Sequence, residues 1–282
     1  MKRTSWRNTA FSRAPVVRIY NEYPDQITQP VKIALVTDLH STRYGRRQEV
    51  LVRALRKYDP DLILLAGDIV DDQVPLVGTR EFLAGIGELT SPRCFYVTGN
   101  HEQRTGNLDA IKKMFTSHGV TVLSGETRTV NIRGQLLEIG GVDDPTVFAP
   151  NRFVRRIPRQ WERQLADCRA GLAGERQLAD CRDGLAGERY SILLTHRPEL
   201  TRYYRESGFD LVVAGHAHGG QVRIPVLGRG LLAPHQGLFP RYAGGRYRLG
   251  RVTMIVSRGL CLNRLPRIFN PPELVMIHLL PD

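Results

Sequence analysis

Cysteine is scarce in this chain of 282 residues, which has four cysteines and no Cys-x-x-Cys pair. Two of the four, Cys168 and Cys181, occupy equivalent positions of an internal repeat. A disulfide framework and a zinc–thiolate site are therefore not expected, because both use cysteines at characteristic spacings. Reduced thiols fit a cytoplasmic protein, and this is the localisation that we predict.

Long apolar runs are also missing. No stretch approaches the roughly 18 apolar residues that a membrane-spanning helix needs. Residues 1–29 hold several basic residues but no long apolar run, so we expect neither a secretory signal nor a membrane anchor there. The predicted organisation is an N-terminal extension over residues 1–29 and one domain over residues 30–282, soluble or at most peripheral at a membrane.

Acidic residues are outnumbered: 28 Asp and Glu stand against 40 Lys and Arg, which gives a formal charge of +12. A positive field favours anionic partners, here a phosphate-ester substrate and an anionic membrane surface. An arginine-rich solvated surface without a function explains the charge equally well. No compact basic block with interleaved aromatic residues occurs, so the sequence gives no support for a specific nucleic-acid site.

The first half of the chain alternates apolar runs of strand length with amphipathic segments. The predicted strands cover residues 31–36, 62–65 and 94–97, and the predicted helices cover residues 48–58, 80–89 and 107–115. This alternation is typical of βαβ units, which build a largely parallel sheet.

After Gly119 short apolar runs follow one another, many of them between Gly and Pro residues. They predict a second, mostly antiparallel sheet. The predicted fold class is therefore α/β, a layered sandwich of two mixed β-sheets flanked by helices.

An internal repeat interrupts this second half. Residues 162–174 read ERQLADCRAGLAG and residues 175–187 read ERQLADCRDGLAG, so they differ only at Ala170 and Asp183. The glycines near the end of each copy disfavour one continuous helix. We interpret the segment at 162–187 as a tandem duplication of one short helix in a surface connection, which is where insertions are tolerated.

Polar side chains follow five of the predicted strands at the point where each strand ends. Because the carboxyl ends of parallel strands meet at one edge of a sheet, we expect these side chains to form one site. The five blocks are Asp38-Leu39-His40, Gly67-Asp68 with Asp71 nearby, Gly99-Asn100-His101-Glu102, His196, and Gly215-His216-Ala217-His218-Gly219-Gly220.

The donor types in these blocks indicate the chemistry. Two Asp, one Asn and four His supply oxygen and imidazole nitrogen without thiolate, a set that suits Mn²⁺, Fe or Zn²⁺ and suits Ca²⁺ poorly. Since a carboxylate can bridge two ions, the set can hold two divalent metal ions about 3.5–4 Å apart. We expect the Asp-x-His and His-x-His pairs to lie on extended segments, where alternate side chains point to the same side.

In this order, the motifs resemble the calcineurin-like metallophosphoesterases, over most of the chain from about residue 31 to residue 280. The later segments GHAHGGQVRIP, SRGL and NPPE resemble the bacterial phosphodiesterase branch with the GHxHGGQ loop. Members of that branch often carry an N-terminal membrane anchor, and we expect this chain to differ from them by lacking one.

The resemblance implies a role for each site residue. Asp38, His40 and His218 would hold one metal, and Asn100, His196 and His216 would hold the other. Asp68 would bridge both. His101 would face the substrate and be held by Asp71, and a metal-bridging hydroxide would be the nucleophile that attacks phosphorus.

Several further residues have open alternatives. Asp71 could instead cap a turn, and Arg223 could hold a substrate phosphate or be an ordinary surface arginine. Glu102 is interpreted as a structural hydrogen-bond partner, and His235 as a lesser candidate for substrate contact. His118, His278, Asp143 and Asp144 are not expected to be ligands.

The predicted function is that of a metal-dependent phosphodiesterase. Two alternatives use the same site, a phosphomonoesterase and a pyrophosphatase acting on a UDP-sugar-lipid. A third alternative is a non-catalytic scaffold on this fold. The presence of every expected ligand argues against it.

Overall fold

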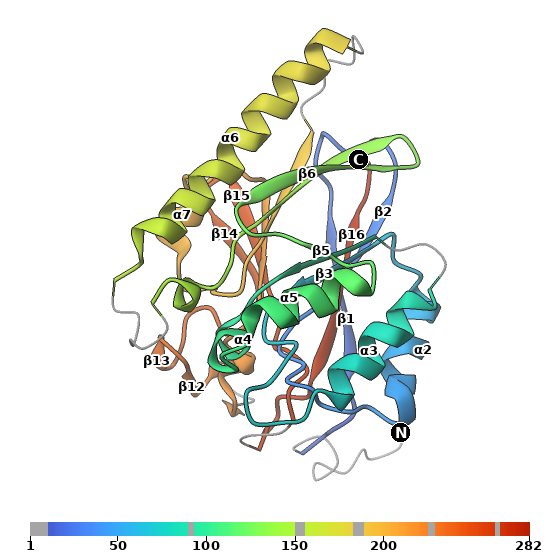
Figure 1. The fold of residues 1–282 in the computed structure, drawn as a ribbon, viewed down its shortest axis with the longest axis vertical. Helices are drawn as coiled ribbons and strands as arrows, with labels where there is room; N and C mark the ends of the chain where they lie inside the picture. The colour runs from blue at the N-terminus through green and yellow to red at the C-terminus, as the bar shows by residue number, and fades with distance from the viewer. Residues whose placement is uncertain (1–10, 90–92, 150–155, 183–188, 225–228, 263–265) are drawn as a thin grey trace.

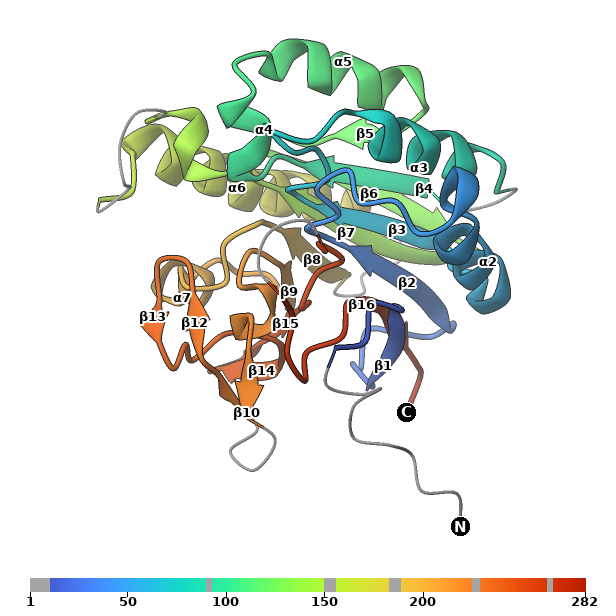
Figure 2. The same cartoon turned by 90° about the horizontal axis from the view of Figure 1, so that it is seen from below.

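The computed structural model describes residues 11–89, 93–149, 156–182, 189–224, 229–262 and 266–282, with the backbone alone for residues 173–182 and Ile224. Two six-stranded sheets form its centre (Figures 1 and 2). The first sheet has the strand order β1-β16-β2-β3-β4-β5 and the second has the order β14-β15-β9-β8-β7-β6.

The first sheet is parallel except where β16 runs antiparallel to β2. Its strands are β1 (Val16–Glu22), β2 (Val31–Val36), β3 (Leu62–Ala66), β4 (Arg93–Val97), β5 (Thr121–Val122) and β16 (Glu273–Leu279). The sequence analysis did not anticipate β1, which lies inside the segment assigned to an N-terminal extension and pairs in parallel with β16.

The second sheet is parallel at its centre and antiparallel at its two edges. Its strands are β6 (Glu126–Ile132), β7 (Gln135–Gly141), β8 (Tyr190–Leu194), β9 (Leu211–Ala214), β14 (Gly245–Leu249) and β15 (Val252–Val256). The expectation of a mostly antiparallel sheet is therefore wrong. Of the later apolar runs, residues 252–256 form β15 and residues 274–280 coincide with β16 of the first sheet, whereas residues 222–224 contribute to a separate antiparallel pair, β10 (Arg223–Ile224) with β11 (Arg229–Gly230). A second separate pair joins β12 (Leu232–Ala233) and β13 (Gly237–Leu238).

The main core lies between the two sheets, where Leu35 and Leu64 of the first sheet share one buried cluster with Ile192 and Val213 of the second. Helices cover the outer faces. α2 (Glu49–Tyr58), α3 (Val77–Gly87) and α5 (Leu108–Ser117) pack on the first sheet, and α6 (Arg159–Arg182) and α7 (Thr201–Tyr204) pack on the second. The predicted α/β sandwich of two mixed sheets flanked by helices is confirmed.

Residues 162–182 of the repeat lie in one continuous helix, α6, rather than in two short ones. Residues 183–187 of the repeat lie outside the described residues. The first turns of α6 are fixed by a buried stripe at helical spacing, Trp161, Leu165, Cys168 and Leu172, which packs on the second sheet. This burial offsets the roughly 1 kcal/mol that an interior glycine costs a helix, so the prediction that the glycines would interrupt it is wrong. Figure 1 shows the end of α6 reaching beyond the strands.

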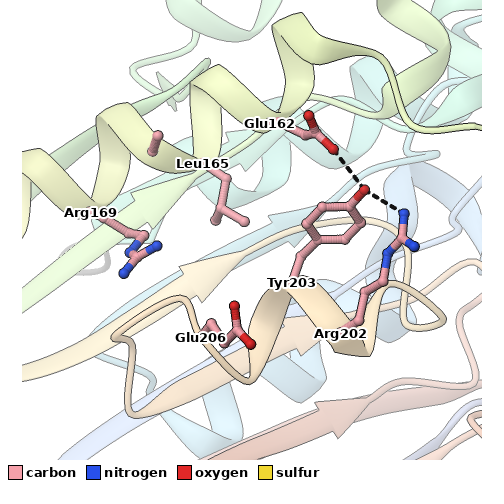
Figure 3. Close-up of a pocket in the computed structure, with 7 residues that line it drawn as sticks. Glu162, Leu165, Arg169, Arg202, Tyr203 and Glu206 are labelled. Atoms are coloured by element: carbon pink, nitrogen blue, oxygen red, sulfur yellow. Dashed lines mark hydrogen bonds between the residues drawn. The ribbon is translucent and has the colours of Figure 1, made fainter.

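A hollow between α6 and α7 shows how the first copy of the repeat is attached (Figure 3). The hydroxyl of Tyr203 donates a hydrogen bond to Glu162 at 2.8 Å and accepts one from Arg202 at 2.6 Å. Leu165 and Arg169 line the same hollow, which contains none of the predicted metal ligands.

Candidate metal centre and active site

The seven predicted ligands lie at one edge of the sandwich, because each follows the carboxyl end of a parallel strand. Asp38, Asp68, His196 and His216 each lie two residues beyond the end of β2, β3, β8 and β9 respectively. Asn100 begins the short helix α4 (Asn100–Arg104) after β4, and His218 follows two residues after His216. Four parallel strands from the first and second sheets and the turn into α4 thus deliver the set to one place.

Two groups of possible ligands share Asp68. Asp38, His40 and Asp68 form one group, and Asp68, His196 and His216 form the other; within each group the ligand atoms lie within 4.8 Å of one another. Asp68 Oδ2 is 3.1 Å from His196 Nε2 and 3.6 Å from His40 Nε2. His218 Nε2 lies 3.6 Å from Asp38 Oδ1, which places it on the Asp38 side of Asp68.

Buried polar atoms at this place fit divalent metal ions. Within the described part of the chain, Asn100 Oδ1 and His216 Nε2 are buried without a hydrogen-bond partner, and such atoms are costly unless something satisfies them. His196 Nδ1 donates to the carbonyl of Ala66 at 2.8 Å, and His40 Nδ1 donates to Asp71 at 2.7 Å. Both imidazoles therefore turn Nε2 toward Asp68, as metal-ligating histidines do when the other nitrogen is held.

The backbone is strained at these residues. Asp38, His40, Asp68, His216 and His218 all have φ between 46° and 65°, in the left-handed region that residues with a side chain seldom adopt. The Asp-x-His and His-x-His pairs therefore do not lie on extended segments, and that expectation is wrong. Left-handed turns immediately beyond the strands aim the donors instead.

Two glycines allow the carboxylates to be approached closely. A Cβ atom on Gly99 would lie 2.2 Å from Asp68 Oδ1, and a Cβ atom on Gly259 would lie 2.6 Å from Asp38 Cβ. Gly259 also has φ +71°, so any other residue there would be strained as well as crowded. Gly259 belongs to the segment SRGL, which carries part of the family resemblance, although no role was predicted for this glycine.

The electrostatics separate the two aspartates. Burial alone would raise the pKa of Asp68, but the neighbouring imidazoles of His196 and His101 outweigh it and hold that pKa well below its ordinary value. Burial likewise opposes a charge on His196, and Asp68 outweighs it, raising the pKa of His196 to about 10. Burial raises the pKa of Asp38, although the imidazoles of His196 and His40 oppose this. Of the two aspartates, Asp68 is therefore the one whose ionised form is stabilised by neighbouring imidazoles.

Glu102 is a structural residue, as the sequence analysis interpreted it. Its carboxylate accepts hydrogen bonds from the backbone N–H groups of Asp68, Ile69, Val70 and Gly99 at 2.8 to 3.0 Å. These bonds join the turn after β3 to the start of α4. Glu102 therefore fixes Asp68 relative to Asn100 without facing the site.

The partner of His101 differs from the prediction. His101 Nδ1 is hydrogen-bonded to Asp72 Oδ1, whereas Asp71 Oδ2 lies 3.7 Å away, beyond hydrogen-bond distance. Asp71 holds His40 instead, so its expected hydrogen bond to His101 is corrected to Asp72. The left-handed turn at Asp68 (φ 51°) redirects the residues that follow, which the pattern Gly-Asp-x-x-Asp could not reveal.

Asn100 and His101 point in different directions because they are neighbours on a helix. Both residues lie in α4 rather than in an extended segment, and successive helical side chains point about 100° apart. The same helix brings Arg104, three residues on, to His101: Arg104 Nη1 lies 3.2 Å from His101 Nε2. Arg104 is exposed and was missed, although its spacing from His101 could have identified it.

Arg223 follows the His-x-His loop and begins β10. Its Nη1 donates to the carbonyl of Gly219, the residue after His218, at 3.2 Å. Burial lowers the pKa of Arg223, and the charged groups that also shift it are Arg258, Tyr247, Glu273 and Arg18. The role of Arg223 in holding a substrate phosphate stays a prediction.

Two further residues reach the centre from outside the motifs. The Sγ atom of the buried Cys261 lies within 4.8 Å of ligand atoms of His40 and His218. The ring of His235 lies 5.3 Å from that of His216, nearly parallel to it. Burial and the charge of Arg197 lower the pKa of His235 to about 4, so this ring is neutral at pH 7.

Beside His196, a buried ion pair stiffens the same loop. Arg197 binds Asp144 in a bidentate manner, with its Nε and Nη2 atoms at 2.6 and 3.0 Å from the carboxylate oxygens. The carboxylate of Asp144 also accepts a hydrogen bond from the N–H of Thr146 at 2.9 Å. The carboxylate of Asp144 thus compensates the positive charge of Arg197, which is buried close to the ligands.

No helix in the described ranges is long and apolar enough to cross a membrane.

Comparison with known proteins agrees with the geometry. The family described as calcineurin-like phosphoesterase matches residues 31–220. YkuE, an uncharacterised metallophosphoesterase of Bacillus subtilis, is 27% identical over 261 residues, which cover 88% of this chain and 78% of YkuE. The phosphodiesterase YaeI of Escherichia coli is 26% identical over 258 residues, which cover 89% of this chain and 82% of YaeI.

Among solved structures, a dimetal phosphatase from Danio rerio is similar with 14% identity and a TM-score of 0.48, covering 82% of this chain and 88% of that one. The family match spans more than half of the chain and includes all seven predicted ligands, from Asp38 to His218. The chain therefore belongs to the calcineurin-like phosphoesterases, metal-dependent hydrolases of phosphoric ester bonds.

Proposed function

We propose that this protein is a phosphodiesterase that uses two divalent transition-metal ions, with Mn²⁺ as the first candidate. The observation that carries the proposal is the pair of donor groups that share Asp68. A single mononuclear site would not need a carboxylate between two sets of imidazoles. The name of YaeI, a phosphodiesterase, supports the choice of a diester substrate.

In this proposal Asp38, His40 and His218 hold one ion, Asn100, His196 and His216 hold the other, and Asp68 is shared. When bound, two such ions act as Lewis acids toward a phosphoryl group and lower the pKa of water to near neutrality. The protein's own part is to keep the donors fixed. Glu102, Asp71 and the carbonyl of Ala66 do this through the hydrogen bonds described above.

His101 serves the leaving group in the proposed reaction. Burial lowers the pKa of His101 even though the charge of Asp68 opposes this, so the imidazole is neutral in the free enzyme at pH 7. A phosphate anion bound near Nε2 favours the protonated form, since an opposite charge raises a histidine pKa. Asp72 on Nδ1 then orients the ring so that Nε2 can donate a proton to the departing oxygen.

Arg104 is the first candidate for the proposed contact to the substrate phosphate, ahead of Arg223. It is exposed, and its guanidinium reaches Nε2 of His101, the atom assigned to the leaving group. A guanidinium matches phosphate oxygens in both charge and geometry.

The test compares three substrates with the same enzyme. Purified protein with added Mn²⁺ is assayed on bis-p-nitrophenyl phosphate, on p-nitrophenyl phosphate and on a UDP-sugar as a pyrophosphate. We expect the diester to have the highest kcat/KM, and chelator followed by dialysis to abolish turnover until metal is restored. Preference for the monoester or for the pyrophosphate would replace the diester assignment with that alternative. Full activity in excess chelator would overturn the two-metal proposal itself.

A matched control separates the site from contaminating activity. His216→Ala removes one predicted ligand, whereas His118→Ala removes an exposed histidine at the end of α5, far from the strand ends in sequence and fold. Only the first change should abolish turnover.

A further inference from the structure

The hairpin of β12 and β13 presents large apolar side chains to solvent. Leu232, Leu238 and Phe239 are 49%, 68% and 51% exposed. Leu232 and Leu238 are directly paired across the two strands, so their side chains lie next to each other on one face. Phe239 follows with φ 54°, a conformation that a bulky residue rarely adopts. Three exposed apolar side chains therefore form one patch, which we call the hairpin patch.

The hairpin patch is held beside the metal centre. The connection between β12 and β13 carries His235, whose ring packs on the predicted ligand His216. Gln236 anchors the same connection, since its side chain donates to the carbonyl of Tyr242 at 3.1 Å and accepts from the N–H of Tyr242 at 2.9 Å. The patch is thus a fixed neighbour of the centre.

The charged residues of the chain segment that contains the hairpin have one sign. No Asp or Glu occurs between Asp210 and Glu273, a stretch of 62 residues that contains nine arginines. The other 220 residues hold 31 basic and 28 acidic residues, so most of the net charge of +12 belongs to this stretch. Arg229 and Arg241 flank the hairpin in sequence and are exposed.

Exposed apolar side chains among positive charges indicate a particular kind of partner. An anionic lipid bilayer offers negative headgroups at its surface and apolar chains just beneath, so it satisfies both features together. A protein partner would need an apolar pocket ringed by acidic residues, which is a more special requirement.

We propose that the hairpin patch docks this enzyme on an anionic bilayer, with Leu232, Leu238 and Phe239 entering the interface and Arg229 and Arg241 facing the headgroups. Docking in this way turns the His216 side of the metal centre toward the lipid headgroups. The substrate class would then be a phosphodiester carried at a bilayer surface; that consequence rests on the proposed function, whereas the docking itself does not.

Vesicle flotation tests the docking without turnover. Full-length protein is mixed with vesicles of phosphatidylcholine alone or with about one third phosphatidylglycerol. We expect wild-type protein to float with the anionic vesicles, to float less with the neutral ones, and to be released by salt. Leu232→Ser/Leu238→Ser/Phe239→Ser should lose the binding, and Arg229→Gln/Arg241→Gln should weaken it about tenfold or more on anionic vesicles.

Matched controls come from exposed residues elsewhere. Ile19 of β1 and Val77 of α3 are 47% and 49% exposed, and these elements lie away from the hairpin in both views (Figures 1 and 2). Ile19→Ser/Val77→Ser should bind like wild type. Arg53→Gln/Arg80→Gln, which removes two exposed arginines from the surface of α2 and α3, should also keep most of the binding.

The outcomes are distinct. Wild-type protein that does not float with anionic vesicles overturns the proposal, as does equal loss in the hairpin and control variants. Hydrolysis of the soluble diester should be unchanged in the hairpin variants. If folded, metal-loaded hairpin variants lose that activity but still float, the patch binds substrate and not the bilayer. If wild-type protein floats but hydrolyses no phosphate ester, the docking stands and the proposed function fails.

Discussion

The imidazole of His101 is hydrogen-bonded to Asp72, and the adjacent Asp71 is hydrogen-bonded to His40. Two consecutive carboxylates therefore serve two different histidines, one assigned to the leaving group and one to a metal ion. This division gives neighbouring and chemically identical substitutions different consequences.

Asp72→Asn and His101→Gln should both retain metal and impair the leaving-group step. With His101→Gln, turnover of a diester with a poor leaving group should fall by roughly 10²–10⁴-fold, the usual scale for a positioned acid. Asp72→Asn should show the same pattern more weakly. A nitrophenyl diester leaves without protonation and should be affected much less, which parallel kcat measurements on the two substrates would establish. Equal losses of turnover on both substrates would instead show that His101 mainly stabilises the charge on the phosphoryl group.

Asp71→Asn is the matched comparison and should act through His40. Loss of the carboxylate that holds Nδ1 typically weakens metal affinity about 10- to 100-fold. We therefore expect the activity of this variant to recover at high Mn²⁺, unlike that of Asp72→Asn. A variant that is insensitive to Mn²⁺ would show that Asp71 does not support a ligand.

Asp68→Asn should remove both metal ions together. Asp68 is common to the two donor groups, and its neighbours hold its pKa low, so a neutral amide at this position forfeits a charge that both groups use. Asn100→Ala should spare the ion held by Asp38 and His40. Elemental analysis should give close to two ions per chain for wild type at saturation, far fewer for Asp68→Asn and an intermediate content for Asn100→Ala. Wild-type metal content in Asp68→Asn would refute the ligand assignment.

Arg104→Gln should raise KM for the diester by about tenfold while kcat changes less. The reason is that a phosphate contact made equally in the bound substrate and in the transition state strengthens substrate binding without accelerating the chemical step. Arg223→Gln is the matched comparison, since its guanidinium donates to the carbonyl of Gly219. The assignment of Arg104 would fail if the two variants had the same KM.

The duplicated segment offers an internal control in the form of two deletions. Removing residues 175–187 or residues 162–174 leaves chains that differ only in Ala or Asp at position 170, which is exposed. Both deletions keep a leucine and a cysteine where Leu165 and Cys168 are buried, so both should fold and retain turnover. Leu165→Ala in the full chain should instead cost about 2–5 kcal/mol of unfolding free energy. Denaturant unfolding of the three variants tests this prediction. Different unfolding free energies for the two deletion variants would mean that the residue at position 170 affects stability.

Stability should depend on pH through Asp61, which joins the two sheets. Arg133, in the turn between β6 and β7, donates to Asp61 at 3.1 Å and to the carbonyl of Pro30 at 2.6 Å. Burial opposes ionisation of Asp61, but the hydrogen bonds from Arg133 and from the N–H of Lys32 outweigh it and lower its pKa.

A carboxylate with a lowered folded pKa contributes stability above its unfolded pKa, near 4, and loses the contribution as the pH falls through the folded value. Asp61→Asn should therefore be less stable than wild type at pH 6 to 7, and the difference should shrink below pH 4. Denaturant midpoints across this range measure it, with Asp59→Asn, an exposed neighbouring change, as the control. A difference that persists unchanged at pH 3 would show that the contribution is not ionic.

Local sequence patterns predicted most of the central strands, although not β1, and the donor chemistry. Continuous apolar runs such as residues 31–36 and 190–194 became β2 and β8 at the predicted bounds, because a buried strand leaves a local pattern. Each donor block adjoins such a run, so placing the strand ends also placed Asp38, Asp68, His196 and His216 at one edge.

Only the tertiary structure decided which groups meet across the chain. The left-handed turns at Asp38, Asp68 and His216 set the direction of the side chains, and no sequence periodicity encodes them. The return of β15 beside β9, the pairing of β1 with β16, and the approach of Cys261 and His235 to the centre depend on contacts between distant segments. The pairing of Asp72 with His101 belongs to the same class, because it is fixed by how the turn after β3 packs on α4. Local sequence patterns indicate which side chains are buried, whereas packing between distant segments determines which residues they contact.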